Sequence, residues 1–247
     1  MSEGLDHHAI VERWHTFQNP TTQEKLDRLI AACALRDGDR VLDVGCGKAW
    51  LLRRMAAAHR IEGIGVDIRA AFLTEARDCI EREGGRGAIA LIEAPAITYT
   101  AAPASFDVGL CIGASFAIGS FEAMVGWLKP LVRSGGILAV GDIYVLDAAR
   151  PAQCVKYFAG GAVRTLADTV DVLAAAGCSL LALIASSKDD WDRYESLHWQ
   201  AAEAWLRENA EHPDAEAFRL GNERYRQDYL RHERDSLGWA IFVCRIG

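Results

Sequence analysis

The sequence lacks the features that would point to a membrane protein, a nucleic-acid-binding protein or a chain of several domains. None of its uninterrupted apolar runs approaches the roughly 18 residues that a membrane-spanning helix requires. Basic charge is not in excess, because 27 Lys and Arg residues face 34 Asp and Glu residues, and the formal net charge is −7. Proteins that bind nucleic acid usually gather basic charge against the phosphates. No repeat or low-complexity linker divides the 247 residues, so we expect one domain without membrane or nucleic-acid partners.

Cysteine pairs and metal-binding motifs are also missing. The seven cysteines are widely spaced and form no C-x-x-C pair, so neither a disulfide framework nor a zinc site is expected. His7, His8 and His15 lack the neighbouring ligands that would complete a metal site. The first residues are polar and acidic, which is not typical of a secretory signal. We therefore predict a cytoplasmic protein that holds no metal.

The sequence does contain a regular alternation of apolar strands and amphipathic helices. Strands are predicted over residues 40–44, 63–67, 88–92, 106–112 and 137–142, and the helices between them over 49–59, 70–83 and 121–132. The strands are nearly continuous apolar runs, which is typical of strands buried on both faces. This alternation predicts an α/β fold, in which helices cover both faces of a parallel sheet.

The pattern changes after residue 142. A helix near 166–176 and a strand at 180–185 precede a polar, mostly helical stretch, and the last strand is predicted at 239–245. Because some fifty residues separate these two strands, the stretch between them is predicted to form a helical cap rather than a loop. We divide the single domain, 1–247, into an N-terminal helical arm at 1–36, a core at 37–146 and the cap insert at 186–236.

One face of the predicted cap is aromatic. Trp191, Tyr194 and His198 recur at helical spacing and could line a substrate pocket. The same pattern is typical of a helix face that packs the cap onto the domain, with His198 as a hydrogen-bonded core histidine. The cap also carries 8 basic and 13 acidic residues, so −5 of the chain's −7 lies there. This charge disfavours a large polyanionic substrate and favours a neutral or cationic small molecule.

The motif that carries chemistry lies at the end of the first strand. Asp43, Gly45 and Gly47 form a D-x-G-x-G pattern between a strand and a helix, where glycine allows a ligand to approach the backbone. Trp50 stands where a dinucleotide-binding loop would have its third glycine, which argues against an NAD-dependent oxidoreductase. The pattern resembles motif I of the class I S-adenosylmethionine-dependent methyltransferases.

Further segments agree with this resemblance. Asp67 ends the second strand, where the family places an acid that accepts both ribose hydroxyls, and Ile68 follows in the position of an adenine contact. Residues 106–108 resemble the family's fourth-strand signature, and residues 131–136 resemble its turn before the fifth strand. The resemblance implies a Rossmann-like, seven-stranded and mostly parallel sheet whose last strand is antiparallel. The helical insert before that strand resembles a smaller bacterial group of the family.

Two positions depart from the family pattern. Ala49 stands where a third glycine is common, and Pro95 stands where an acid usually lies near the adenine amino group. Asp43 is expected to orient the glycine loop through backbone N–H groups, and Glu93 or backbone groups near Ala94 could replace the missing acid. The resemblance implies S-adenosylmethionine as cofactor, with contacts from Asp43, Gly45, Cys46, Gly47, Asp67, Ile68, Glu93, Ala94 and Cys111.

The resemblance predicts an enzyme that transfers the methyl group of S-adenosylmethionine to a small-molecule acceptor by in-line displacement, leaving S-adenosylhomocysteine. Positioning can supply much of the acceleration, and a base is needed only where the acceptor loses a proton. The candidates for that base are Asp142, Tyr144 and His198, while His7, His8, Trp14 and His15 could close over the site. The alternatives are a non-catalytic, regulatory S-adenosylmethionine-binding protein and, disfavoured by the charge, an RNA methyltransferase.

Overall fold

A seven-stranded sheet runs through the middle of the molecule. The computed structural model describes residues 5–147 and 162–247, and the strand order is β3-β2-β1-β4-β5-β7-β6. Strands β1 to β5 are parallel, whereas β7 lies antiparallel between β5 and β6. The predicted Rossmann-like sheet with an antiparallel last strand is therefore confirmed. The strands span Arg40–Val44 (β1), Glu62–Asp67 (β2), Ala88–Glu93 (β3), Phe106–Ile112 (β4), Val132–Val145 (β5), Cys178–Ala185 (β6) and Leu237–Ile246 (β7).

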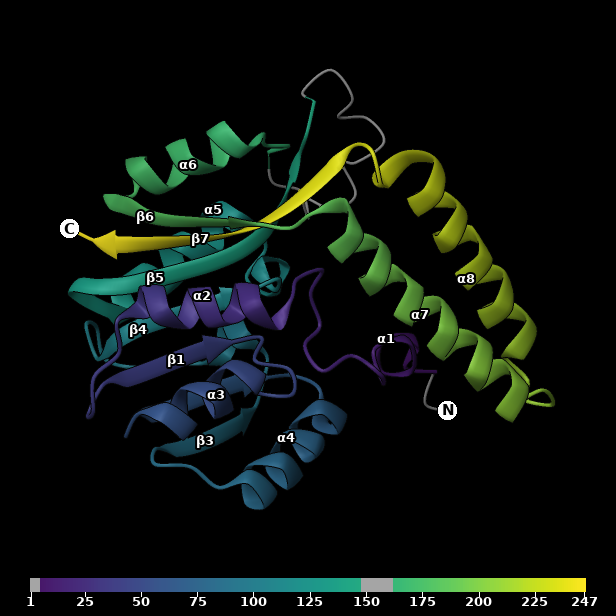
Figure 1. The fold of residues 1–247 in the computed structure, drawn as a ribbon, viewed down its shortest axis with the longest axis horizontal. Helices are drawn as coiled ribbons and strands as arrows, with labels where there is room; N and C mark the ends of the chain where they lie inside the picture. Colours follow the sequence, from purple (N-terminus) through teal and green to yellow (C-terminus); the bar gives the residue numbers. More distant parts are fainter. Residues whose placement is uncertain (1–4, 148–161) are drawn as a thin grey trace.

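Helices cover both faces of this sheet, as Figure 1 shows. The strands alternate between two apolar cores: in β1, Val41 belongs to one core and Leu42 to the other. Successive side chains of a strand point to opposite faces, so a sheet covered on both sides requires continuous apolar strands. One core contains residues of α2 (Gln23–Cys33), α3 (Trp50–Ala58) and α4 (Ala70–Glu83), and the other contains residues of α5 (Phe121–Leu128) and α6 (Leu166–Ala175).

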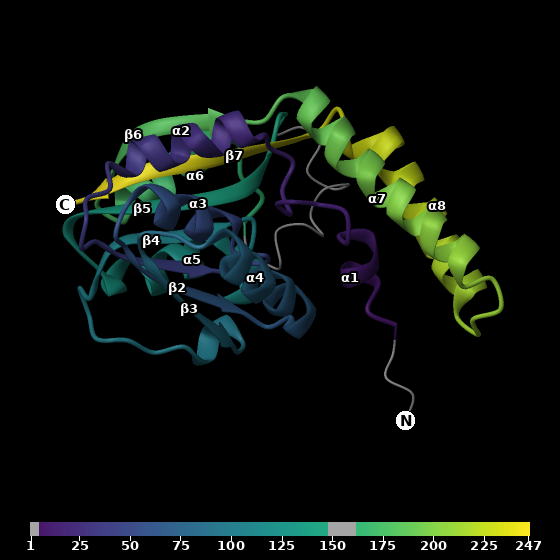
Figure 2. The ribbon, with the colours of Figure 1, turned by 60° about the horizontal axis from the view of Figure 1, so that its bottom comes forward.

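The insert between β6 and β7 is helical, as predicted. It consists of α7 (Lys188–Glu208), α8 (Ala215–Asp228) and a π-helical turn over Tyr229–Glu233. Figure 2 shows α7 and α8 side by side and projecting away from the sheet, with the short helix α1 (His7–Val11) beside α7. The N-terminal arm is therefore divided in space, because α2 packs on the sheet while α1 packs on the cap.

The differences from the sequence predictions concern the ends of elements. Strand β5 begins at Val132 rather than 137, because Gly135 and Gly136 continue the strand through an irregular register instead of forming a turn. The α-helix predicted over 121–132 ends at Leu128 and continues as a 3-10 turn over Lys129–Leu131. Across 5–147 and 162–247, no helix combines the length and the apolar character that crossing a membrane requires.

Candidate active site

The loop between β1 and α3 has the conformation that its glycines make possible. Gly45 and Gly47 have φ angles of +70° and +51°, in the left-handed region that favours glycine. A β-carbon at Gly45 would lie 2.3 Å from the β-carbon of Ala114, and one at Gly47 would lie 2.4 Å from Oε1 of Gln18. Ala49, in the position of the family's third glycine, also adopts a left-handed φ of +52°. Both the backbone angles and the close packing therefore favour glycine in this loop.

Asp67, at the carboxyl end of β2, holds the glycine loop. Its Oδ2 accepts a hydrogen bond from the Gly47 N–H at 2.8 Å, and its Oδ1 accepts one from the Arg69 N–H at 2.9 Å. The loop N–H is thus bound by Asp67, in the role that we expected of Asp43. Each carboxylate oxygen has two lone pairs, so Asp67 can still accept hydrogen bonds from the hydroxyl groups of a ligand.

Asp43 is a buried acid beside this loop, with an exposed fraction of 3%. Burial and the neighbouring carboxylate of Asp67 together raise its pKa to about 7. Both causes act in the same direction, because each makes the charged form less favourable than the neutral one. A cationic ligand group near Asp43 would stabilise the carboxylate, so this position is suited to an ammonium group.

A cavity of about 730 Å³ opens at the carboxyl ends of the parallel strands and reaches the cap. In open α/β sheets, ligands bind in the crevice outside these strand ends. The cap side of its wall includes Glu195 and Tyr225. The structure brings ten of the predicted site residues together along the wall of this cavity: Asp43, Gly45, Cys46, Gly47, Asp67, Ile68, Ala94, Asp142, Trp191 and Tyr194.

Four predicted site residues lie outside the cavity wall. Glu93 ends β3 with its side chain in solvent, and Cys111 is fully buried in the core, where burial raises the pKa of its thiol. The ring of Tyr144 packs over Gly238, its cross-strand partner on β7. A β-carbon at position 238 would lie 2.2 Å from this ring, so only glycine leaves space for it. His198 faces the N-terminal arm. The geometry therefore does not support direct ligand contact by these four side chains.

The N-terminal arm supplies wall residues that the sequence did not indicate. Phe17, Gln18 and Asn19, between α1 and α2, lie along the cavity. The side-chain amide of Asn19 donates to the carbonyl oxygen of Ile112, at the end of β4, at 3.0 Å. These two residues are 93 positions apart in the chain, so no local pattern marks the contact.

The arm residues that were expected to close over the site divide into different environments. His8 lines the cavity. His7 packs its ring against Phe218 of the cap, and Trp14 remains half-exposed. His15 is buried between the arm and the cap, and its Nε2 lies 3.0 Å from a backbone oxygen of α7. The expected closure therefore rests on His8 alone among these four residues.

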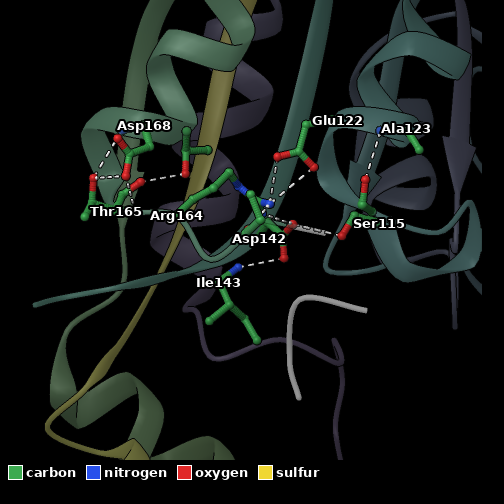
Figure 3. A network of polar contacts seen from close by, with 11 residues as sticks. Ser115, Glu122, Ala123, Asp142, Ile143, Arg164, Thr165 and Asp168 are labelled. Carbon is green, nitrogen blue, oxygen red and sulfur yellow. Dashed lines mark hydrogen bonds and ion pairs between the residues drawn. The ribbon is translucent and has the colours of Figure 1, made fainter. Parts of the chain in front are cut away.

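Asp142 is the predicted base that does line the cavity, and a polar network holds it (Figure 3). Its Oδ2 accepts hydrogen bonds from Ser115 Oγ at 2.8 Å and from Arg164 at 3.2 Å, while its Oδ1 accepts one from the Ile143 N–H at 2.8 Å. The buried Arg164 also donates to Glu122 at 3.1 Å. Burial raises the pKa of Asp142 above its ordinary value, although these donors oppose the effect. The network thus fixes the position of an acid that binds protons more readily than usual.

A second polar cluster lies between the arm and the cap. His198 Nε2 is 3.0 Å from Glu12 Oε1, and His198 Nδ1 is 3.5 Å from Glu195 Oε2. Burial alone would lower the pKa of His198, but the interactions with these two carboxylates outweigh burial and raise the pKa to about 9. The geometry agrees with the interpretation of His198 as a hydrogen-bonded core histidine.

Comparison with known proteins gives matches over the core and over the whole chain. Residues 41–136 match the family described as "Methyltransferase domain". The chain is 28% identical over 238 residues to the uncharacterized protein YjhP of Escherichia coli K12, covering 95% of this chain and 96% of that one. The solved structure of YjhP has a TM-score of 0.88 and covers 98% of this chain and 99% of its own.

Two named methyltransferases also match at full length. One from Geobacter sulfurreducens, described as S-adenosylmethionine-dependent and solved with S-adenosyl-L-homocysteine, is 27% identical, covers 100% of both chains and has a TM-score of 0.89. The 27-O-demethylrifamycin SV methyltransferase of Amycolatopsis mediterranei is 28% identical over 253 residues, covering 98% of this chain and 90% of that one. With the strand order, the glycine loop and Asp67 all in place, the chain belongs to the class I S-adenosylmethionine-dependent methyltransferases.

Proposed function

We propose that this enzyme methylates a small molecule that binds between the core and the cap. The observation that carries the proposal is one continuous cavity, which has the glycine loop and Asp67 at one end and Trp191, Tyr194 and Tyr225 at the other. Such a cavity can hold a nucleoside cofactor and an acceptor together. The name of the Amycolatopsis relative supports the same conclusion, because its acceptor is a small molecule.

The cofactor end fits the adenosyl group and the amino-acid part of S-adenosylmethionine. Asp67 has free lone pairs for the ribose hydroxyls, and Ile68 has an exposed apolar side chain suited to the adenine face. The backbone around Ala94 lies along the wall where Pro95 replaces the family's acid. Asp43 suits the ammonium group of the methionine part.

When bound, S-adenosylmethionine supplies an electrophilic methyl group on a sulfonium sulfur. The enzyme's contribution is to hold the acceptor in line and to exclude water, and residues of the arm and the cap line the cavity together with the strand ends. Asp142 is the wall residue best suited to take a proton from a hydroxyl or an ammonium acceptor, because its pKa is raised and its position is fixed.

Calorimetry with S-adenosylmethionine and S-adenosylhomocysteine tests the cofactor end. Asp67→Asn should weaken the affinity for both by at least tenfold, about 1.4 kcal/mol, because the charged acceptor of the ribose hydroxyls is lost. Glu93→Gln is the matched control, since Glu93 is the register partner of Asp67 on β3 and lies outside the cavity wall. Equal effects of the two substitutions, or no binding by the native chain, would contradict the assignment.

The acceptor end needs a separate test. A panel of hydroxyl- and amine-bearing small molecules is screened for the appearance of S-adenosylhomocysteine. With any acceptor found, Trp191→Ala should lower kcat/KM and leave the affinity for S-adenosylhomocysteine unchanged, because Trp191 lies at the cap end of the cavity. A loss of cofactor affinity in Trp191→Ala would contradict this division of the cavity.

We also infer a cytoplasmic location. The six cysteines within the described residues are free thiols, and five of them are buried. Buried, reduced thiols that pack as small apolar side chains are typical of proteins in a reducing compartment.

A further inference from the structure

Three buried side chains with metal-ligand chemistry meet where the N-terminal arm packs against the cap. Glu12 directly follows α1, His15 lies three residues further on, and His198 comes from α7. Their exposed fractions are 0%, 3% and 6%. One potential ligand atom of each lies within 4.8 Å of those of the other two. None of the three belongs to the wall of the large cavity, so the proposed methyl transfer does not account for them.

The hydrogen bonds of His15 leave one ring nitrogen without a partner. Its Nε2 lies 3.0 Å from the backbone oxygen of Tyr194, which can only accept a hydrogen bond, so Nε2 carries the proton of the neutral ring. The lone pair of Nδ1 then faces Glu12 Oε2 at 3.2 Å, and neither atom has a hydrogen-bond partner. Two acceptors that face each other in a buried place repel unless a cation lies between them.

His198 is held in a similar way from its other side. Its Nδ1 is 3.5 Å from Glu195 Oε2, and its Nε2 is 3.0 Å from Glu12 Oε1. Metal-binding histidines almost always donate their second ring N–H to a carboxylate or a backbone carbonyl, which fixes the ring for the metal. His15 has the carbonyl of Tyr194 in this role, and for His198 the nearby carboxylate is that of Glu195, whose Oε2 lies 3.5 Å from Nδ1. Both rings are thus oriented with their remaining nitrogen toward Glu12. Nε2 of His198 donates a hydrogen bond to Glu12 Oε1, so a metal ion bound there would take the place of that proton.

The donor atoms lie close enough together for one metal ion to reach all three residues. His198 Nε2 lies 3.0 Å from Oε1 of Glu12, and His15 Nδ1 lies 3.2 Å from the other carboxylate oxygen, Oε2. In a tetrahedral Zn²⁺ site with bonds of about 2.0–2.1 Å, neighbouring ligand atoms lie roughly 3.3 Å apart. Two imidazoles and one carboxylate are a donor set that binds Zn²⁺ with a fourth position left open.

The charge around the cluster also favours a cation. Glu12, Glu195 and Glu233 are three buried acids in this region, and the charge of Glu233 acts on Glu195. Lys48, whose charge reaches His15, is already paired with an acid on α4 at 2.8 Å. A divalent ion between Glu12 and the two histidines would place positive charge beside the buried carboxylates of Glu12 and Glu195.

We propose that Glu12, His15 and His198 bind a divalent metal ion, and that Zn²⁺ fits this donor set best. The ion fastens the N-terminal arm to α7 and thereby fixes Tyr194 and Glu195, which line the acceptor end of the cavity. Sequence patterns do not reveal this site, because Glu12 and His198 are 186 residues apart.

The test is a Zn²⁺ titration of the full chain, without an affinity tag, in competition with a chelating dye. We expect one equivalent of Zn²⁺ to bind and to raise Tm, with the rise reversed by a chelator. Mg²⁺ should not bind, because it requires oxygen ligands in octahedral geometry. If the folded native chain binds no Zn²⁺ at micromolar concentrations, or binds Mg²⁺ equally well, the proposal is overturned.

Substitutions locate the site. Glu12→Gln and His198→Gln each remove one donor, and each should weaken Zn²⁺ binding by more than the roughly 100-fold that loss of an outer-shell partner can cost. His212→Gln is the matched control, because His212 lies on the same helical cap outside the cluster. Circular dichroism checks that the variants fold. If they do not fold, the rise in Tm that Zn²⁺ causes in the native chain decides whether the metal binds. A loss in His212→Gln equal to that in His198→Gln would place the metal elsewhere and refute the assignment.

Discussion

Asp43 is a buried acid whose charge costs stability, so removing that charge should change how stability depends on pH. In β1 it pairs with Gly65 on one side and Leu110 on the other, and burial together with Asp67 raises its pKa from 3.8 to about 7. Below pH 3.8 the carboxyl group is protonated in both the folded and the unfolded chain. Above that pH the unfolded chain ionises first, so folding loses free energy until the pH passes about 7.

The isosteric substitution Asp43→Asn removes this pH dependence. The pKa of Asp43 is 3.8 in the unfolded chain and about 7 in the folded one. Between pH 5 and pH 8, the free energy of unfolding of the native chain should therefore fall by about 3 kcal/mol more than that of the variant. Urea unfolding of both proteins at half-unit pH steps gives the difference directly. Parallel curves for the two proteins would show that the folded-state pKa of Asp43 is not raised, and would refute this reasoning.

A second variant separates the two causes of the raised pKa. Asp67→Asn keeps Asp43 buried but removes the neighbouring negative charge. As the pH rises, the free energy of unfolding of the Asp67→Asn variant should therefore stop falling at a lower pH than that of the native chain. If that pH does not move, burial alone accounts for the pKa, and the coupling between the two acids is absent.

Three further predictions concern single side chains. Ala34 caps α2 in the left-handed region (φ +49°) with its side chain exposed, so Ala34→Gly should stabilise the chain by about 1 kcal/mol and raise Tm by about 2–4 °C in calorimetry. Arg164→Met leaves the buried Asp142 without its cation, and the free energy of unfolding in urea should fall by about 3–5 kcal/mol. Gly45→Ala should abolish tight binding of S-adenosylhomocysteine in calorimetry, because the new β-carbon would lie 2.3 Å from a neighbouring one. The control is Gly126→Ala, in α5, where a β-carbon would meet open space. This variant should bind S-adenosylhomocysteine normally, and its free energy of unfolding should rise by about 1 kcal/mol.

Local patterns were sufficient to predict most of the fold. The apolar strands, the helices between them and the helical insert could each be predicted from neighbouring residues, and the structure confirms them. The start of β5 was not readable in this way. Gly135 and Gly136 are typical of a turn, and only the pairing of β5 with β4 shows that the chain continues as a strand through them.

In the candidate site, too, local patterns predicted some residues and not others. Gly45, Gly47 and Asp67 could be predicted because strand ends and a glycine loop bring them together by local geometry. Tyr144 could not be placed, since it lies on the same face of β5 as Asp142 and only the absence of a side chain at Gly238 shows where its ring packs. Side chains that meet through the folding of the arm onto the cap are likewise outside the reach of local patterns.

The acidity of the cap has a different meaning once its side chains are placed. Asp192 pairs with Arg234 at 2.7 Å, and Arg219 and Arg226 each pair with a glutamate three residues before them on the exposed side of α8. Surface pairs of this kind are screened within about 8 Å at physiological salt. Among the described residues of the cavity wall, Glu195 is the acid that the cap contributes, and burial raises its pKa. Within the cavity wall, a preference of the cap for a cationic acceptor would therefore come from Glu195.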